Sequence, residues 1–110
     1  MKLTVNHQDI MLDDEGYLVN LQDWSPAVAK ALAERESITL TESHWQIIEL
    51  LRAFYQQYAL SPSNRPLIKY LNQQLPTQQI NSLTLNLLFN GSPAKLAAKL
   101  AGLPKPTNCL

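Results

Sequence analysis

Apolar residues recur every three or four positions over most of this chain, which predicts a mainly α-helical protein. The clearest stretch follows Thr41, which can cap the free backbone N–H groups of a helix that begins near Glu42. Its apolar positions are Trp45, Ile48, Leu51, Phe54, Tyr55 and Tyr58. Such a stripe is more typical of a core face than of a binding surface, so we expect this helix to be the centre of the core.

Capping signals predict one helix before the stretch that begins near Glu42 and one near the C-terminal end of the chain. Ser25-Pro26 starts the earlier helix, because Ser25 can cap it and proline at the first helical position loses no hydrogen bond. Ser92-Pro93 repeats that opening, and the final helix is predicted to run over residues 93–101 and to stop at Gly102.

Two more helices are predicted between residues 61 and 91. Ser63 or Asn64 caps the first of them, which contains residues 65–71. The second covers roughly residues 78–88 and ends where Gly91 can adopt the left-handed conformation. Its apolar positions are Ile80, Leu83, Leu87 and Leu88.

The N-terminal stretch has the pattern of a short β-hairpin. Leu3-Thr4-Val5 and Ile10-Met11-Leu12 flank four polar residues, of which Asn6 suits a positive φ. An isolated hairpin is marginal in water, so we expect this one, over about residues 3–12, to lie against helices. The fold class is therefore a compact bundle of about five helices with an N-terminal hairpin.

The last eight residues have a different composition from the rest of the chain. Pro104 and Pro106 forbid a helix and favour an extended path. At roughly 3.1 Å per residue, such a path carries the side chain of Cys109 about 20 Å from the last helix. We therefore divide the chain into a domain, residues 1–102, and a mobile C-terminal arm, residues 103–110.

Length and composition agree with a single small domain. The chain has 110 residues, of which 45% are hydrophobic, and no apolar stretch is long enough to span a bilayer. The first residues lack the apolar run of a secretory signal, and one cysteine cannot form an internal disulfide. We expect a cytoplasmic protein that has no contact with the membrane.

The formal net charge of zero conceals a strong asymmetry between the two halves of the chain. All nine acidic residues lie between Asp9 and Glu49, and that half has a net charge of −6. The half from Leu50 onward has no acidic residue and a net charge of +6. This polarity predicts a cationic face for an anionic partner, halves that pack together and neutralise each other, or both.

The single cysteine is the main candidate for chemistry. A free cysteine is often only a small buried hydrophobe, but Cys109 is the second-last residue and lies beyond two prolines, where burial is least expected. A thiol on a tether suits relay chemistry, in which the thiolate attacks a donor persulfide and later releases the sulfur to a second partner. A loaded persulfide is anionic, so a positive groove would stabilise it.

Other chemistries have little support in the sequence. His7 and His44 stand far from each other and from the one cysteine, so their spacing predicts no metal site, and His44 reads as an ordinary first-turn residue. There is no Gly-rich phosphate loop. Two alternatives to a carrier stay open: a helix-turn-helix-like nucleic-acid-binding module, and an adaptor that presents its arm to a protein groove.

The C-terminal motif resembles one protein family in particular. Gly91-Ser92-Pro93-Ala94-Lys95, then Lys99-Leu100-Ala101-Gly102-Leu103-Pro104-Lys105-Pro106 and the penultimate Cys109, are similar to the DsrC/TusE family of sulfur-relay proteins. Upstream matches extend the resemblance over almost the whole chain; they are Glu15-Gly16-Tyr17-Leu18, Trp24, His44-Trp45, Phe54-Tyr55, Ser61-Pro62, Arg65 and Lys69. The resemblance implies the same helical domain, hairpin and C-terminal arm.

The resemblance also implies a function, a sulfurtransferase that carries a persulfide on Cys109 and needs no metal or other cofactor. Members with two cysteines, which work with dissimilatory sulfite reductase, have the second cysteine eleven positions earlier, where this chain has Ala98. The chain is therefore closest to the single-cysteine branch, although a sulfite reductase partner stays an alternative. That branch accepts sulfur from a TusBCD-like donor complex. It passes the sulfur to an MnmA-like tRNA thiouridylase, possibly with tRNA bound, for thiolation of the wobble uridine.

Other candidate functional residues are basic residues that could bind the persulfide or a partner, and the glycine and prolines at the start of the arm. In the family, the positions of Arg65 and Lys69 lie near the place where the arm folds back, and their spacing puts both on one helix face. They either hold the persulfide or dock a partner, or they are solvated surface charges. Weaker candidates for the same role are Lys95, Lys99 and Lys105. Gly102, Pro104 and Pro106 are expected to act as hinge and spacer.

Overall fold

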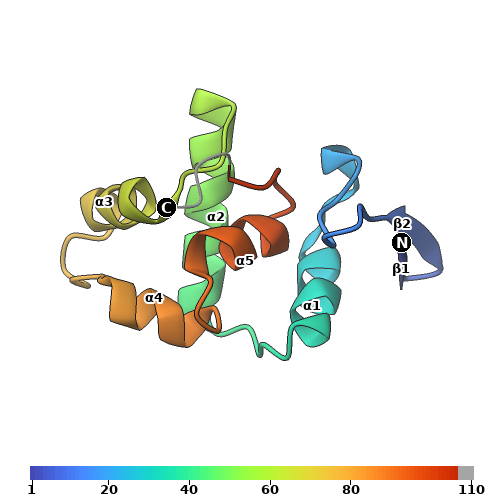
Figure 1. Cartoon of the computed structure of the whole chain (residues 1–110), viewed down its shortest axis with the longest axis horizontal. Coiled ribbons are helices and arrows are strands. Elements are labelled where there is room, and N and C mark those ends of the chain that lie inside the picture. Colours follow the sequence, from blue (N-terminus) through green and yellow to red (C-terminus); the bar gives the residue numbers. More distant parts are fainter. Residues whose placement is uncertain (107–110) are drawn as a thin grey trace.

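The computed structural model describes residues 1–106, and residues 107–110 lie outside the described part. The elements in chain order are β1 (Lys2–Val5), β2 (Gln8–Met11), the 3₁₀ turn η1 (Leu21–Asp23), α1 (Pro26–Arg35), α2 (Glu42–Tyr58), α3 (Asn64–Gln74), α4 (Ser82–Leu88) and α5 (Pro93–Leu100). The hairpin and α1 lie at one end of the molecule, and α3 and α4 lie at the other (Figure 1). The predicted helical bundle with an N-terminal hairpin is confirmed.

The hairpin is closed by the shortest kind of β-turn. β1 and β2 are antiparallel, and Val5 pairs with Gln8, so only two residues form the turn. Both of them, Asn6 and His7, have positive φ values of 49° and 67°, as such a turn requires. The sheet does not stand alone, because Ile10 is buried and β1 packs against α1.

Helix α5 is the centre of the structure. It packs against each of the other four helices, and Figure 1 shows it in the middle of the molecule. Its side chains are mostly small and buried; the buried ones are Pro93, Ala94, Leu96, Ala97, Ala98 and Leu100. Small side chains let the neighbouring helices approach closely, so the position of the C-terminal segment is set by the best-packed element of the fold.

Helix α2 has its fully buried residues in the part up to Leu51, and Tyr55 further along packs half-buried against the core. Ile47, Ile48 and Leu51 are buried, but Tyr58 at its C-terminal end is exposed, so the predicted stripe is partly a surface feature. His44 is buried at the N-terminal end, where its Nδ1 accepts a hydrogen bond from the N–H of Thr41 at 3.0 Å. Its Nε2 therefore carries the proton and donates to a backbone carbonyl of α4 at 2.8 Å. The prediction of a structural first-turn histidine agrees with these bonds.

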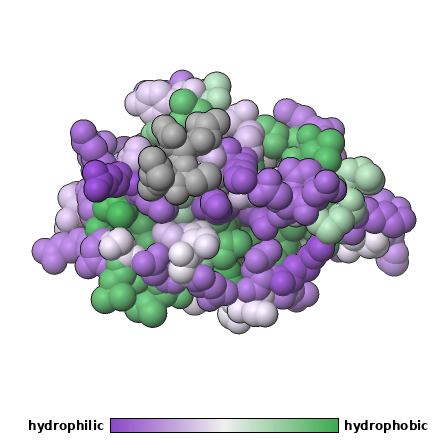
Figure 2. Space-filling model, in the orientation of Figure 1, coloured by the Kyte–Doolittle hydropathy of each residue, from purple (hydrophilic) through white to green (hydrophobic). Residues whose placement is uncertain are grey.

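Helix α4 differs from the prediction in length and in its buried face. It begins at Ser82, not near residue 78, because the side chain of Asn72 hydrogen-bonds both the N–H and the C=O of Ile80 and holds that segment out of a helix. Leu85 is fully buried, whereas Leu83 and Leu87 are 66% and 76% exposed. Two of the four apolar positions of the predicted helix, Leu83 and Leu87, therefore lie on the surface and not in the core. Figure 2 shows hydrophobic surface over this part of the molecule.

The two oppositely charged halves of the chain do pack together. Lys99 forms a salt bridge with Glu36 at 3.3 Å, and Lys105 forms one with Glu15 at 2.9 Å. Each pair joins the basic half to the acidic half, so the asymmetry is partly neutralised by folding. Among residues 1–106, no helix is long and apolar enough to cross a membrane.

Candidate functional site

The chain leaves α5 through a turn that depends on glycine. Gly102 has a φ of +72°, and the N–H of Leu103 returns to the carbonyl of Ala98 at 2.9 Å. This is the hydrogen-bonding pattern that ends many helices. A Cβ at Gly102 would lie 2.6 Å from Cγ of Trp24, so glycine is required by the space as well as by the backbone conformation. The exit direction of the C-terminal segment is thereby fixed.

Side chains from three separate parts of the chain hold the backbone around this turn. The indole Nε1–H of Trp24 donates to the carbonyl of Leu100 at 2.9 Å. Arg52 donates from Nη1 to the carbonyl of Ala101 at 2.7 Å, and the buried Ser61 hydroxyl donates to the carbonyl of Pro104 at 2.6 Å. These are long-range contacts, so the path of the segment is determined by tertiary structure and not by its prolines alone.

The next residues continue against the surface of the domain. Leu103 is only 3% exposed, Pro106 is buried, and Lys105 is tied to Glu15. The predicted division between a domain, 1–102, and a mobile arm, 103–110, stays a prediction. Cys109, the predicted catalytic residue, lies outside the described residues.

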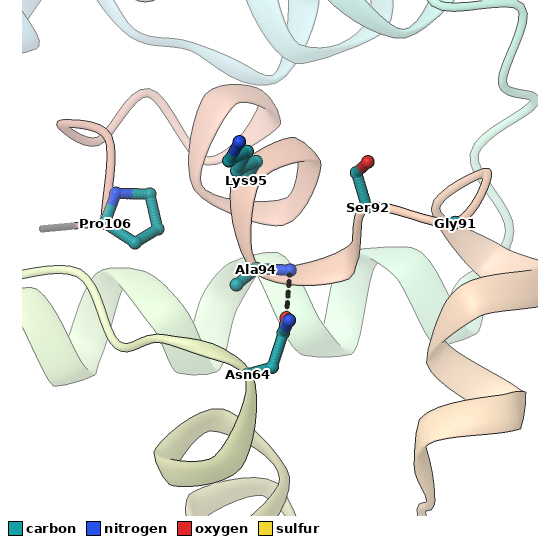
Figure 3. Close-up of a pocket in the computed structure, with 6 residues that line it drawn as sticks. All are labelled: Asn64, Gly91, Ser92, Ala94, Lys95 and Pro106. Carbon is teal, nitrogen blue, oxygen red and sulfur yellow. Dashed lines mark hydrogen bonds between the residues drawn. The ribbon is translucent and has the colours of Figure 1, made fainter. Parts of the chain in front are cut away.

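A small polar pocket lies where the described chain ends. It has a volume of about 170 Å³ and is lined by Asn64, Gly91, Ser92, Ala94, Lys95 and Pro106. The Oδ1 atom of Asn64 accepts a hydrogen bond from the N–H of Ala94 at 3.0 Å, which ties the start of α3 to the start of α5 (Figure 3). One cation, Lys95, stands at this pocket, so it favours an anionic group.

The five predicted basic residues occupy different environments. Arg65 and Lys69 are exposed on α3, one turn apart, and Lys95 is exposed at the pocket. Lys99 is only 14% exposed, because it pairs with Glu36, and Lys105 pairs with Glu15. Arg65, Lys69 and Lys95 form no salt bridge with any carboxylate of residues 1–106, so they are the three whose charge is open to a partner.

A second hollow, which we call the Arg52 groove, lies between η1, the C-terminal half of α2 and Leu103. It has a volume of about 550 Å³, and its walls include Leu21, Trp24, Tyr55 and Leu103 with Arg52 between them. The guanidinium of Arg52 stacks on the indole of Trp24 with 3.9 Å from Cζ to the ring centroid. Burial lowers the pKa of Arg52 from its ordinary value, although a guanidinium stays charged at neutral pH.

Sequence reasoning gave no functional role to Trp24, Arg52 or Ser61. The one available signal was the position of Arg52, a cation within the apolar stripe of α2, between Leu51 and Tyr55. In the described part of the chain, no three His, Cys, Asp or Glu side chains come together as metal ligands.

Comparison with known proteins gives concordant matches over the whole chain. A family described as "DsrC like protein" matches residues 4–110. The protein is 51% identical over 105 residues to a Sulfurtransferase TusE of Sodalis glossinidius, a match that covers 96% of this chain and 97% of the relative. It is 45% identical over 108 residues to a Sulfurtransferase TusE homolog of Haemophilus influenzae, with coverage of 98% and 99%.

Solved structures agree with these sequence matches. The NMR structure of DsrC from Allochromatium vinosum superposes with a TM-score of 0.90 at 43% identity and full coverage of both chains. The crystal structure of the oxidized gamma-subunit of the dissimilatory sulfite reductase (DsrC) from Archaeoglobus fulgidus gives 0.86 at 37% identity, again over both full chains. The chain is similar to these proteins in fold, length and sequence.

Proposed function

This chain belongs to the family of DsrC-like proteins, and on that premise we propose that it is a sulfurtransferase that carries sulfur as a persulfide on Cys109. The observation that carries the proposal is the near-full-length identity to relatives named Sulfurtransferase TusE, together with a family match that extends to the last residue. The chain has one cysteine, so the sulfur has one place to bind.

The proposed chemistry consists of two exchanges that need no external oxidant. In the first, the thiolate of Cys109 attacks the outer sulfur of a donor persulfide. A new S–S bond forms on Cys109, the S–S bond of the donor breaks, and the donor leaves as a thiolate. In the second, a thiolate of the acceptor attacks the outer sulfur on Cys109, and Cys109 returns to the thiolate form. Thiolate formation therefore controls both steps.

The fixed backbone after α5 supports this role, because it limits the distance that the sulfur on Cys109 can reach from the domain. Pro106 is buried against the domain, and Cys109 is only three positions later in the chain. Three residues of extended chain span at most about 10 Å. A carrier built in this way offers its sulfur close to its own surface, so each partner must dock on that surface to receive it.

We propose that the donor is a TusBCD-like complex and that the acceptor is an MnmA-like tRNA thiouridylase, with thiolation of the wobble uridine as the outcome. The relatives named TusE support a sulfur relay of this kind. Ala98, 1% exposed in the core, occupies the position where two-cysteine members have their second thiol. An internal disulfide is therefore impossible here, which favours a simple relay over the work of a sulfite reductase subunit.

Three of the basic residues are proposed to contact the loaded sulfur or a partner. Arg65, Lys69 and Lys95 are exposed and free of carboxylates within residues 1–106. A persulfide is an anion at neutral pH, so nearby cations stabilise the loaded form. Lys99 and Lys105 are weaker candidates because each already neutralises an acidic residue.

The decisive experiment measures transfer of labelled sulfur from a purified donor complex to the chain and then to the thiouridylase. The native protein should gain one labelled sulfur atom on Cys109 and pass it on, whereas Cys109→Ser should gain none. Circular dichroism should show that the variant stays folded. Full transfer by Cys109→Ser would contradict the proposal.

The basic residues are tested by a pair of matched substitutions in the same assay. Lys95→Gln should slow delivery of sulfur, whereas Lys30→Gln, an exposed lysine on α1, should not. Equal rates for the two variants would make Lys95 an ordinary solvated charge.

A further inference from the structure

The Arg52 groove has a positive charge that the described protein does not neutralise. Arg52 uses one N–H on the carbonyl of Ala101 and one face of its guanidinium on Trp24. No carboxylate of residues 1–106 lies within salt-bridge distance of it. A guanidinium has five N–H donors, and a partly buried charge without a counter-charge is costly. A feature of this kind is expected where a partner supplies the missing anion.

The residues around this charge are those that concentrate binding energy at protein interfaces. Tryptophan, tyrosine and arginine dominate interface hot spots, and this groove places Trp24, Arg52 and Tyr55 side by side, with Leu21 and Leu103 beside them. Aromatic walls exclude water from an ion pair and so strengthen it. The groove is thus suited to a side chain that is charged at its end and flanked by apolar neighbours.

We propose that the Arg52 groove is the docking site for a protein partner of the sulfur relay, which inserts an Asp or Glu side chain against Arg52. This inference rests on the proposed carrier function, because the partner is taken to be the sulfur donor or acceptor. The groove lies beside the segment that leads to the cysteine, since Leu103 forms part of its wall. Cys109 is six positions after Leu103, a length of chain that spans at most about 20 Å, so a protein docked here is within reach of the thiol.

The lining favours a protein over a nucleic acid. Binding to a phosphate backbone needs several cations, and Arg52 is the one cation among the residues that line this groove. The exposed cations Arg65, Lys69 and Lys95 belong to α3 and α5 and not to this groove.

The test compares two neighbouring glutamines on α2. Gln56 and the adjacent Gln57 are both exposed, but only Gln56, one turn after Arg52, lines the groove. Gln56→Glu keeps the size of the side chain, and it supplies Arg52 with an internal carboxylate that repels the carboxylate of a partner. Gln57→Glu makes the same change of charge outside the groove. Both variants are made in the Cys109→Ser background, so that binding is measured without sulfur transfer.

Affinity for the purified donor complex and for the purified thiouridylase is measured by calorimetry. Gln56→Glu should weaken binding of at least one of them by about tenfold or more, and Gln57→Glu should change neither by more than about twofold. In NMR spectra, the same partner should shift the indole N–H signal of Trp24 and leave that of Trp45 in place. Equal affinities for the two variants, or an unmoved Trp24 signal, would overturn the proposal.

Two other occupants would also overturn it. If Gln56→Glu weakens binding of purified tRNA and of neither protein, the groove binds nucleic acid. If it alters the sedimentation of the chain alone, the groove binds a second copy. Failure of the carrier function gives a different result: the native protein then gains no labelled sulfur from the purified donor complex, whereas a wrong docking site leaves loading and delivery by the native protein intact.

Discussion

Replacing Gly102 by alanine tests the idea that close packing on Trp24 fixes the start of the C-terminal segment. The new Cβ would lie 2.6 Å from Cγ and 2.8 Å from Cβ of Trp24, which are distances that no relaxed structure keeps. Trp24 or the glycine turn must therefore move. Overpacking of this kind costs about 1–3 kcal/mol of unfolding free energy.

Two further contributions come from the backbone. The φ of +72° is unfavourable for alanine by about 1–2 kcal/mol, and the loss of freedom in the unfolded chain returns about 0.4–1 kcal/mol. The net expected loss for Gly102→Ala is therefore about 1–4.5 kcal/mol. Displacement of the indole also breaks its hydrogen bond to Leu100 and its stacking on Arg52, so we expect the loss to fall in the upper part of this range.

Gly91→Ala is a matched control for the backbone contribution. Gly91 has a φ of +84°, and a Cβ added there would meet nothing within 4 Å. Urea denaturation followed by circular dichroism should show Gly91→Ala close to native, within about 1.5 kcal/mol. The difference between the two variants, about 1–3 kcal/mol, then measures the contact with Trp24 alone.

A double variant makes the test sharper. In a Trp24→Ala background the indole is absent but the Cβ of residue 24 still lies 2.8 Å from the added Cβ, so the difference between Gly102→Ala and Gly91→Ala should shrink without vanishing. Equal costs of the two glycine substitutions in the native background, or a difference that the removal of the indole leaves unchanged, would show that Trp24 does not determine the need for glycine at position 102.

Three other predictions concern single side chains. Ser61→Ala should lower the unfolding free energy by about 1–2 kcal/mol in a urea titration, because it leaves the backbone carbonyl of Pro104 without its donor. Ser63→Ala should cost little in the same titration, because Ser63 caps α3 without a side-chain hydrogen bond. Leu85→Ala should cost about 2–5 kcal/mol and Leu87→Ala no more than about 0.5 kcal/mol, which thermal melts would separate. Burial raises the pKa of Tyr70 above its ordinary value of 10.0, so the folded state favours the neutral phenol. The contribution of Tyr70 to the unfolding free energy is therefore fully present below pH 10 and is lost as the pH rises through the raised pKa. Tyr70→Phe should reduce this alkaline fall in melting temperature.

Local signals predicted most of the secondary structure. Ser25 accepts a hydrogen bond from the N–H of Val28, Asn6 has a positive φ, and Pro93 begins α5 as its position before an apolar run indicated. Each of these depends on chemistry within about four residues. Their success reflects the small number of ways in which a cap, a two-residue turn or a proline can be accommodated.

The errors and omissions come from contacts between distant residues. The start of α4 was misplaced because the amide of Asn72, eight residues earlier, binds the backbone at Ile80. The bonds that hold the C-terminal segment join residues 76, 49 and 43 positions apart, so no local pattern marks Trp24, Arg52 and Ser61 as their donors. The role of Cys109 was inferred from its place in the chain and from resemblance, and it stays a prediction.

The hydrogen bonds that fix the backbone after α5 shorten the part of the chain that can carry Cys109 to a partner. Counted from Gly102, the tether to Cys109 has seven residues; counted from the buried Pro106, it has three. The effective concentration of the thiol at a docked partner falls roughly as the −3/2 power of tether length. The shorter tether therefore gives about a fourfold higher effective concentration at a partner that lies close. A partner that lies beyond the span of the tether is not reached at all. A long free arm would give a low effective concentration of the thiol at every partner, whereas a short arm gives a high one only at a partner that docks beside it. The contacts made by Trp24, Arg52 and Ser61 therefore favour selectivity among sulfur acceptors over reach, and the docking site proposed in the Arg52 groove lies next to them.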